Sequence, residues 1–268
     1  MKFIEKFNSI RSKNSALCIG LDPDPALFPP SILTEKNPAL KFCREIIDAT
    51  SDLVCGYKPN SAFFEAFSGQ ETMKELREYI GDELITIADA KRGDIGNTAR
   101  MYARAFFENM GFDAITLNPY MGYDAIEPFA SYEDKMSFIL CLTSNPSSKD
   151  FEELSLMREN TGTHLSAQSL WELVAEKTNE WNENDNLGLV VGATKPGTFR
   201  RIREITGIPL LVPGIGKQGG KITDVVGYSG AIIPTVSRSI IYASRDKDFA
   251  EAARKKAEEF VKELNYSH

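Results

Sequence analysis

The segment LITIADAKRGDIGNTA, residues 84–99, decides the fold, because it joins a buried strand to the start of a helix through a cluster of charges. Its first part, LITIADA (84–90), is short and nearly continuously apolar. Such a run is typical of a strand buried on both faces, as in parallel sheets. The stretch that follows, NTARMYARAFFENM (97–110), predicts a helix that ends at Gly111, a residue type common just after helices.

The same strand–helix rhythm recurs along the whole chain. Seven further apolar runs are ALCIGLD (16–22), LVCGYKPN (53–60), DAITLNP (113–119), SFILCLT (137–143), LGLVVGA (187–193), IPLLVPG (208–214) and GAIIPT (230–235). Amphipathic stretches between them predict helices, among them PALKFCREIIDATS (38–51) and the final KDFAEAARKKAEEFVKELN (247–265). Alternating strands and helices predict parallel strands with helical crossovers.

Eight units in 268 residues, at roughly 33 residues each, are typical of a (β/α)8 TIM barrel. The alternative is a doubly wound open sheet, which usually carries GxGxxG after its first strand. Here the first strand ends in GLDPDP. We therefore expect one barrel domain over residues 1–268, with an exposed loop and one or two extra helices in the long gap at 144–186.

Composition excludes several classes of function. Lys and Arg number 31 and Asp and Glu 38, a formal net charge of −7, which leaves no electrostatic footprint for nucleic acid or an anionic membrane. No apolar run reaches the ~18 residues of a membrane helix. The first ten residues, MKFIEKFNSI, lack the apolar stretch of a signal peptide, so we expect a cytoplasmic protein.

Cysteine and histidine offer little for chemistry. Cys18, Cys43, Cys55 and Cys141 form no CxxC pair, and we expect buried free thiols. The only histidines are His164 and His268, so a His-rich metal site or a Ser-His-Asp triad has almost nothing to build with. Any catalysis must come from Lys, Asp, Glu, Arg or backbone groups.

The charges of residues 89–94 form the first candidate site. Active sites of such barrels lie at the carboxyl ends of the strands, where this cluster falls. Asp89 and Lys91 are two residues apart, so on an extended chain they point the same way, and Asp94 follows one short turn later. Carboxylates beside the ammonium keep Lys91 protonated, which suits a general acid. Asp89 would repel a substrate carboxylate placed against it. Departure of that carboxylate as CO2 would remove the repulsion. The alternative is a surface ion-pair cluster.

The second candidate site is PGIGKQGG, residues 213–220. Gly214, Gly216, Gly219 and Gly220 expose backbone N–H groups that can hold a phosphate, and the loop follows the seventh strand, where barrels commonly bind phosphate. Arg238, after the eighth strand, could add a bidentate contact. The alternative is a tight turn without a ligand.

Together these motifs resemble the orotidine 5′-phosphate decarboxylase family, in its longer bacterial-type subgroup. The resemblance spans the chain and is carried by GLDPDP (20–25), YKPN (57–60), DAKRGDIGNTA (89–99), NPYMG (118–122), TSNPSS (143–148), PGIGKQGG (213–220) and Arg238. It implies decarboxylation of orotidine 5′-phosphate to UMP, the last step of de novo pyrimidine synthesis, with no cofactor and no metal.

The resemblance also implies a role for each motif residue. Lys91 would give the proton to C6 and Asp89 would lie against the leaving carboxylate. Asp94 and Thr98 would reach the site of the other subunit of a homodimer. The expected substrate contacts are Asp22 and Lys58 to ribose hydroxyls, Ser144 to the pyrimidine, and Gln218 and Arg238 to the phosphate under the loop of Gly214, Gly216 and Gly219. It gives Asn118 and Asn145 no defined role.

Two other functions stay open from the sequence. Mg²⁺-dependent sugar-phosphate decarboxylases and synthases of the same suprafamily share Asp-x-Lys-x-x-Asp, but they place an acidic metal ligand where this chain has Lys58, whose ammonium would repel a cation. A non-catalytic nucleotide-binding barrel would keep the phosphate site and lack the proton donor.

Overall fold

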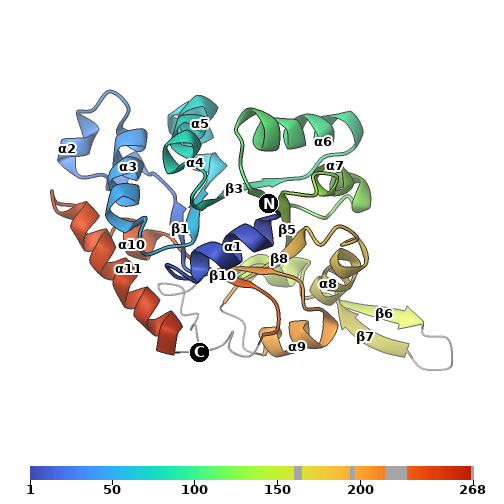
Figure 1. Cartoon of the computed structure of the whole chain (residues 1–268). Coiled ribbons are helices and arrows are strands. Elements are labelled where there is room, and N and C mark those ends of the chain that lie inside the picture. The colour runs from blue at the N-terminus through green and yellow to red at the C-terminus, as the bar shows by residue number, and fades with distance from the viewer. Residues whose placement is uncertain (160–164, 194–196, 215–227, 267–268) are drawn as a thin grey trace.

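A computed structural model describes residues 1–159, 165–193, 197–214 and 228–266 of the chain. Eight parallel strands close into a barrel in the order β1-β10-β9-β8-β5-β4-β3-β2 (Figure 1). The strands are β1 (Cys18–Leu21), β2 (Gly56–Pro59), β3 (Ile85–Arg92), β4 (Ala114–Leu117), β5 (Met136–Leu142), β8 (Leu187–Val191), β9 (Leu210–Pro213) and β10 (Ile232–Val236). Each lies within or overlaps one of the eight predicted runs, so the predicted (β/α)8 barrel is confirmed.

Helices follow the strands and cover the outside of the barrel (Figure 1). The α-helices are α1 (Phe3–Arg11), α2 (Pro30–Leu33), α3 (Pro38–Thr50), α4 (Ser61–Phe67), α5 (Gly69–Ile80), α6 (Gly96–Ala103), α7 (Glu127–Ala130), α8 (Leu170–Glu180), α9 (Thr198–Ile205), α10 (Arg238–Ile241) and α11 (Phe249–Tyr266). Short helical turns are η1 (Pro25–Leu27), η2 (Arg104–Asn109), η3 (Tyr123–Ala125) and η4 (Pro146–Asp150). The stretch predicted as one helix over 97–110 changes at Arg104 from α6 into η2, a π-helical turn.

The strands form because their apolar residues are buried on both faces. Every residue of β4 and of β8 is buried, since one face lines the barrel interior and the other lies under helices. The four cysteines are free and buried, as expected. In the described part of the chain, no helix is long and apolar enough to cross a membrane.

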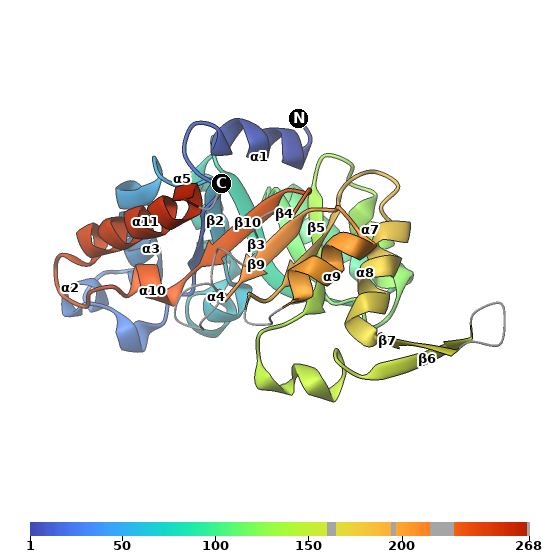
Figure 2. The same cartoon turned by 90° about the horizontal axis from the view of Figure 1, so that it is seen from below.

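The prediction for 144–186 was incomplete. Besides η4 and α8, the segment contains an antiparallel hairpin of β6 (Ser155–Glu159) and β7 (Leu165–Ser169), which projects from the barrel (Figure 2). SLMRE and LSAQS mix polar with apolar residues over only five positions each. They lack the continuous apolar character of a barrel strand, so the sequence pattern did not reveal them.

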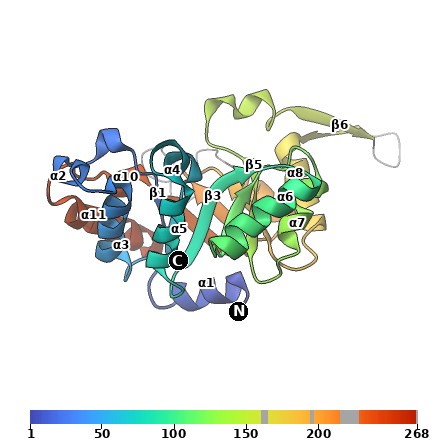
Figure 3. The same ribbon diagram turned by 90° about the horizontal axis from the view of Figure 1, so that it is seen from above.

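The N-terminal helix α1 closes the end of the barrel where the strands begin. Lys6 on α1 forms an ion pair with Asp113, which immediately precedes β4, with 3.0 Å between Nζ and Oδ2. The same carboxylate accepts hydrogen bonds from the backbone N–H and the hydroxyl of Thr86 near the start of β3, both at 2.9 Å. Figure 3 shows α1 on the opposite side of the barrel from the segment that follows β5. Helix α1 therefore does not cover the carboxyl ends of the strands, where the sequence predicts the candidate site.

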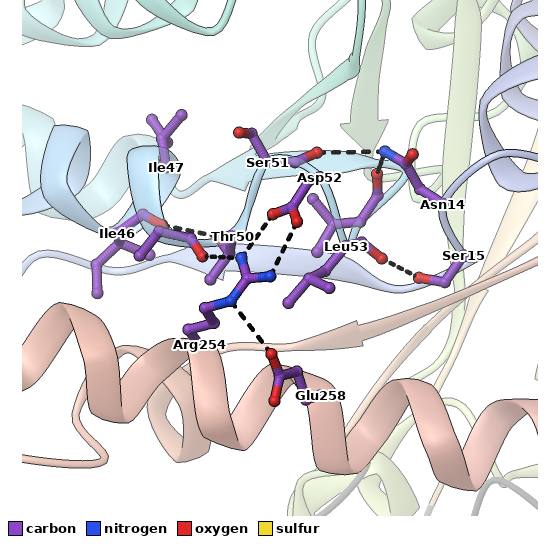
Figure 4. A network of polar contacts seen from close by, with 12 residues as sticks. Asn14, Ser15, Ile46, Ile47, Thr50, Ser51, Asp52, Leu53, Arg254 and Glu258 are labelled. Atoms are coloured by element: carbon purple, nitrogen blue, oxygen red, sulfur yellow. Dashed lines mark hydrogen bonds and ion pairs between the residues drawn. The ribbon is translucent and has the colours of Figure 1, made fainter.

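The last helix, α11, is attached to the loop after α3 by a polar network around Arg254 (Figure 4). Its guanidinium donates to both carboxylate oxygens of Asp52, at 2.7 and 2.9 Å, and to the carbonyl of Ala49 at 2.8 Å. Glu258, one turn further along α11, holds Arg254 Nε at 3.1 Å. The network fixes the last helix beside the first strand–helix unit.

Gly56 on β2 tests how closely the barrel strands pack. A Cβ at this position would lie 2.0 Å from the carbonyl oxygen of Ile85 on the neighbouring strand β3, a backbone atom that cannot move without breaking the ladder. We expect Gly56→Ala to lower the free energy of unfolding by about 1–3 kcal/mol or more. Gly207→Ala is the control, because its Cβ would meet only Ser229 Oγ at 3.4 Å, and it should change stability by less than ~0.5 kcal/mol. Denaturant unfolding measures both, and equal stability of the two variants would contradict the packing argument.

Candidate active site

The described site residues gather at the carboxyl ends of the strands, as the sequence predicts. Lys58, Asp89 and Lys91 lie within β2 and β3, and the others follow a strand directly or start the next helix. Those others are Asp22 after β1, Asp94 after β3, Thr98 in α6, Ser144 after β5, Gly214 after β9 and Arg238 at the start of α10. Gln218, Gly216 and Gly219 lie outside the described residues.

One carboxylate held between two ammonium groups forms the centre of the site. Asp89 Oδ2 lies 2.5 Å from Lys58 Nζ, and Asp89 Oδ1 lies 2.5 Å from Lys91 Nζ. The side chains of Lys58 and Asp89 are 7% and 11% exposed, whereas Lys91 is 49% exposed. Lys58 is therefore the more deeply buried partner of Asp89, and Lys91 is the more accessible of the two ammonium groups. No local sequence pattern indicates the Lys58–Asp89 pair, because the two residues lie 31 positions apart.

Charge balance keeps this buried centre ionised. Burial alone would raise the pKa of Asp89, but the nearby ammonium groups of Lys58 and Lys91 outweigh burial and hold that pKa well below its ordinary value. Burial would likewise lower the pKa of Lys58, yet the carboxylates of Asp89 and Asp22 raise it overall. Asp89 is thus a carboxylate and Lys58 an ammonium at neutral pH.

Lys91 has an unusual backbone conformation for a strand residue. Its φ is +46°, in the left-handed region that favours glycine. It belongs to a bulge, because the β3–β4 register pairs Ala88 with Ile115 but Arg92 with Leu117. Three residues of β3, from Asp89 to Lys91, therefore face the single residue Thr116 of β4. The bulge directs the Lys91 side chain toward Asp89, although the chain is not extended there as the sequence analysis assumed.

Asp94 does not complete the charge cluster within its own chain. Its Oδ1 accepts the backbone N–H of Ile95 at 2.8 Å, and within the described residues it forms no ion pair with Lys91. Within the described residues, Asp89 is therefore the carboxylate that pairs directly with both Lys58 and Lys91, and Asp94 of the same chain does not join them.

Asp22 lies on the β1 side of the same centre. Its Oδ2 accepts the hydroxyl of Ser237 at 2.5 Å, and its backbone carbonyl accepts Tyr242 Oη at 2.7 Å. Its Oδ1 is buried and has no hydrogen-bond partner in the described part of the protein. Gly20 allows this arrangement, since a Cβ there would lie 2.8 Å from Ser237 Cβ. One carboxylate oxygen of Asp22 is therefore held in place, and the other is buried without a hydrogen-bond partner among the described residues.

The segment after β5 is held by Glu152, a residue that the sequence did not indicate as part of the site. Glu152 accepts the backbone N–H of Thr143 at 2.7 Å and the Thr143 hydroxyl at 2.8 Å. The neighbouring Ser144 packs against Gly192 after β8, where a Cβ would lie 2.9 Å from the Ser144 nitrogen. No sequence signal pointed to Glu152, because it lies eight residues beyond Ser144 in the long gap. The contacts place Ser144 at the carboxyl end of the barrel.

The predicted phosphate site is described only in part. Gly214 has φ +91°, which suits glycine at the start of a turn, and it directly follows β9. The exposed Arg238 follows β10, the neighbouring strand. These two residues flank the same point on the rim of the barrel.

Comparison with known proteins identifies the family of this site. The model of the "Orotidine 5'-phosphate decarboxylase / HUMPS family" matches residues 15–255. The chain belongs to this family. A curated orotidine 5'-phosphate decarboxylase of Herpetosiphon aurantiacus is 48% identical over 97% of this chain and 96% of its own length. One of Dehalococcoides mccartyi is 46% identical over 99% and 98%. The solved OMP decarboxylase of Leishmania donovani has a TM-score of 0.82 at 33% identity and covers 100% of this chain and 99% of its own.

The positive φ of Lys91 can be tested through stability. Lys91→Gly and Lys91→Ala both remove the ion pair with Asp89, but only glycine adopts φ +46° without steric cost. We expect the glycine variant to be more stable than the alanine variant by about 1 kcal/mol. The comparison needs denaturant unfolding of both proteins. An alanine variant as stable as the glycine variant would show that the bulge is not strained.

Proposed function

We propose that this chain decarboxylates orotidine 5′-phosphate to UMP, the last step of de novo pyrimidine synthesis. The observation that carries the proposal is the Asp89 carboxylate held between Lys58 and Lys91 at the carboxyl end of the barrel. Relatives that match nearly the full length are named as this decarboxylase, which does not favour the Mg²⁺-dependent or non-catalytic alternatives.

Asp89 and Lys91 carry the reaction in this proposal. The substrate carboxylate at C6 lies against ionised Asp89, which repels it, while the Lys91 ammonium faces C6. When the C6–carboxylate bond breaks, CO2 leaves and the electron pair remains on C6, where it takes a proton from Lys91 Nζ. Lys91 regains the proton from solvent. A positioned ammonium stabilises the developing carbanion as charge builds up, so the residues act electrostatically.

The remaining residues bind the nucleotide at a distance from C6. We assign ribose hydroxyls to Lys58 and Asp22, the pyrimidine to Ser144, and the phosphate to Arg238 with Gln218 and the loop of Gly214, Gly216 and Gly219. Rate accelerations at the upper end of the enzyme range, ~10^17-fold, correspond to roughly 23 kcal/mol, which one ion pair cannot supply. Binding energy from the phosphate must therefore hold the base against Asp89 and Lys91.

We further propose a homodimer in which Asp94 and Thr98 reach the partner's site. Large apolar side chains stay exposed near Asp94, with Ile95 at 52% and Met101 at 49%, and α6 packs against η3 and α7. Tyr120 and Met121, which precede η3, are 85% and 45% exposed. A surface of this kind is typical of a protein–protein interface. A partner's Asp94 would bring a second carboxylate to the Lys91 ammonium, which in one chain is paired with Asp89.

The activity is tested by following the absorbance of orotidine 5′-phosphate on adding purified protein. We expect turnover without added cofactor, unchanged by EDTA, and UMP as product. Lys91→Ala should lower kcat by at least ~10^2–10^4-fold while UMP still binds, because a positioned general acid is lost. Inhibition by EDTA would favour the Mg²⁺-dependent alternative. UMP binding without turnover by the wild-type protein would favour the nucleotide-binding alternative.

Mixed dimers test whether Asp94 acts in the partner's site. Lys91→Ala and Asp94→Asn homodimers should each be nearly inactive. After mixing equal amounts and reassembly, about half of the dimers are mixed, and one site of each combines intact Lys91 with intact Asp94. Roughly a quarter of all sites should then recover, given two-fold symmetry. Activity that stays at the level of the two homodimers would show that Asp94 serves Lys91 of its own chain.

A further inference from the structure

We propose that Thr116 is the residue that positions the proton donor, through a hydroxyl that links the backbone of Lys91 to the carboxylate of Asp89. This inference rests on the proposed function, since it gives Thr116 a role in the same site. Thr116 lies on β4, is 1% exposed, and is the single β4 residue opposite the three-residue bulge of β3.

The two hydrogen bonds of Thr116 have directions set by chemistry. The backbone N–H of Lys91 can only donate, so it donates to Thr116 Oγ1, at 3.0 Å. The ionised Asp89 carboxylate can only accept, so the hydroxyl donates to its Oδ1, also at 3.0 Å. The Thr116 hydroxyl thus donates its proton to Asp89 and accepts the Lys91 N–H with an oxygen lone pair. Neither a methyl group nor an alkyl side chain can replace it.

The bulge explains why a side chain is needed at this point. In a regular parallel ladder the N–H of a strand residue donates to a backbone carbonyl of the next strand. The extra residues of β3 interrupt that pattern, and the ladder resumes only where Asn118 N donates to the carbonyl of Arg92 at 2.7 Å. The Lys91 N–H donates instead to the Thr116 hydroxyl. The bond holds Lys91 at φ +46°, the conformation that places its ammonium on Asp89.

Asp89 Oδ1 is the shared point of this arrangement. It accepts both the Lys91 ammonium at 2.5 Å and the Thr116 hydroxyl at 3.0 Å. Loss of the Thr116 hydroxyl would remove two hydrogen bonds at once, the one from the Lys91 backbone N–H and the one to Asp89 Oδ1. The proton donor and its counter-ion would then move relative to each other, while the proposed phosphate contacts after β9 and β10 would remain.

The experiment compares Thr116→Val, which keeps the shape and removes the hydroxyl, with Thr116→Ser, which keeps the hydroxyl. We expect Thr116→Val to lower kcat for orotidine 5′-phosphate by on the order of 10–100-fold with KM nearly unchanged, because misplacement of a catalytic group by about 1 Å can cost that much. Thr116→Ser should stay within about 3-fold of the wild type. A kcat loss equal in both variants, or a loss confined to KM, would overturn the inference.

Thr86→Val is the matched control. Thr86 is also fully buried on β3, and its hydroxyl also joins an aspartate side chain and a backbone N–H, those of Asp113, but at the opposite end of the barrel. It should lower stability without lowering kcat. A fall in kcat equal to that of Thr116→Val would mean that any buried hydroxyl of β3 or β4 supports activity only through the fold.

A crystal structure of Thr116→Val keeps this test separate from the proposed function. The inference requires the Lys91 ammonium to leave Asp89 or Lys91 to leave the left-handed region in this variant, and neither to occur in Thr116→Ser. An unchanged Lys91 would overturn the inference even if the enzyme decarboxylates the nucleotide. Absence of turnover in the wild-type protein would instead overturn the proposed function, and the structures would still decide the role of Thr116.

Discussion

The burial of the Asp89 carboxylate at the carboxyl end of the barrel is the constraint on which the site depends. A buried charge is costly unless it is paired and hydrogen-bonded. Here β2 supplies the Lys58 ammonium, β3 itself supplies Lys91, and β4 supplies the Thr116 hydroxyl. Three adjacent strands are therefore needed to keep one carboxylate ionised, and the closed barrel brings them together.

The bulge in β3 brings the side chain of Lys91 into contact with that of Asp89, two positions earlier on the same strand. Its left-handed residue costs energy locally, and the surrounding structure holds it in place. After the bulge, Arg92 returns to the ladder, and its guanidinium lies over the rings of Tyr102 and Phe106, 5.2 and 5.5 Å from their centroids. The strand is thus fixed on both sides of Lys91, by Thr116 before and by the aromatic rings after.

The two ends of β3 use similar contacts for different purposes. At the start of the strand, Thr86 binds the carboxylate of Asp113, and Lys6 of α1 covers that carboxylate and closes the barrel. At its end, Thr116 and Lys58 bind Asp89, and the Lys91 ammonium stays half exposed. The same pairing of threonine, aspartate and lysine stabilises one end and prepares the other for a substrate.

The sequence by itself determined the barrel, because eight short apolar runs separated by amphipathic stretches allow few other arrangements. It also indicated Asp89, Lys91 and Asp22 as site residues, because polar groups directly after buried strands must meet at one end of a barrel. The β6–β7 hairpin was missed, since its short mixed runs resemble neither a barrel strand nor a helix.

Only the tertiary structure decided how these residues act on one another. Lys58 is 31 positions before Asp89 and Thr116 is 27 positions after it, so no local pattern connects them. Their contacts depend on the register of β2 against β3 and of β3 against β4, and on a bulge that shifts this register. A bulge arises from the pairing of two strands, and a single strand read alone does not reveal it. The sequence therefore predicted which residues share the site. The strand pairing decided that Asp89 is the buried carboxylate, that Lys58 is its buried partner and that Lys91 stays half exposed.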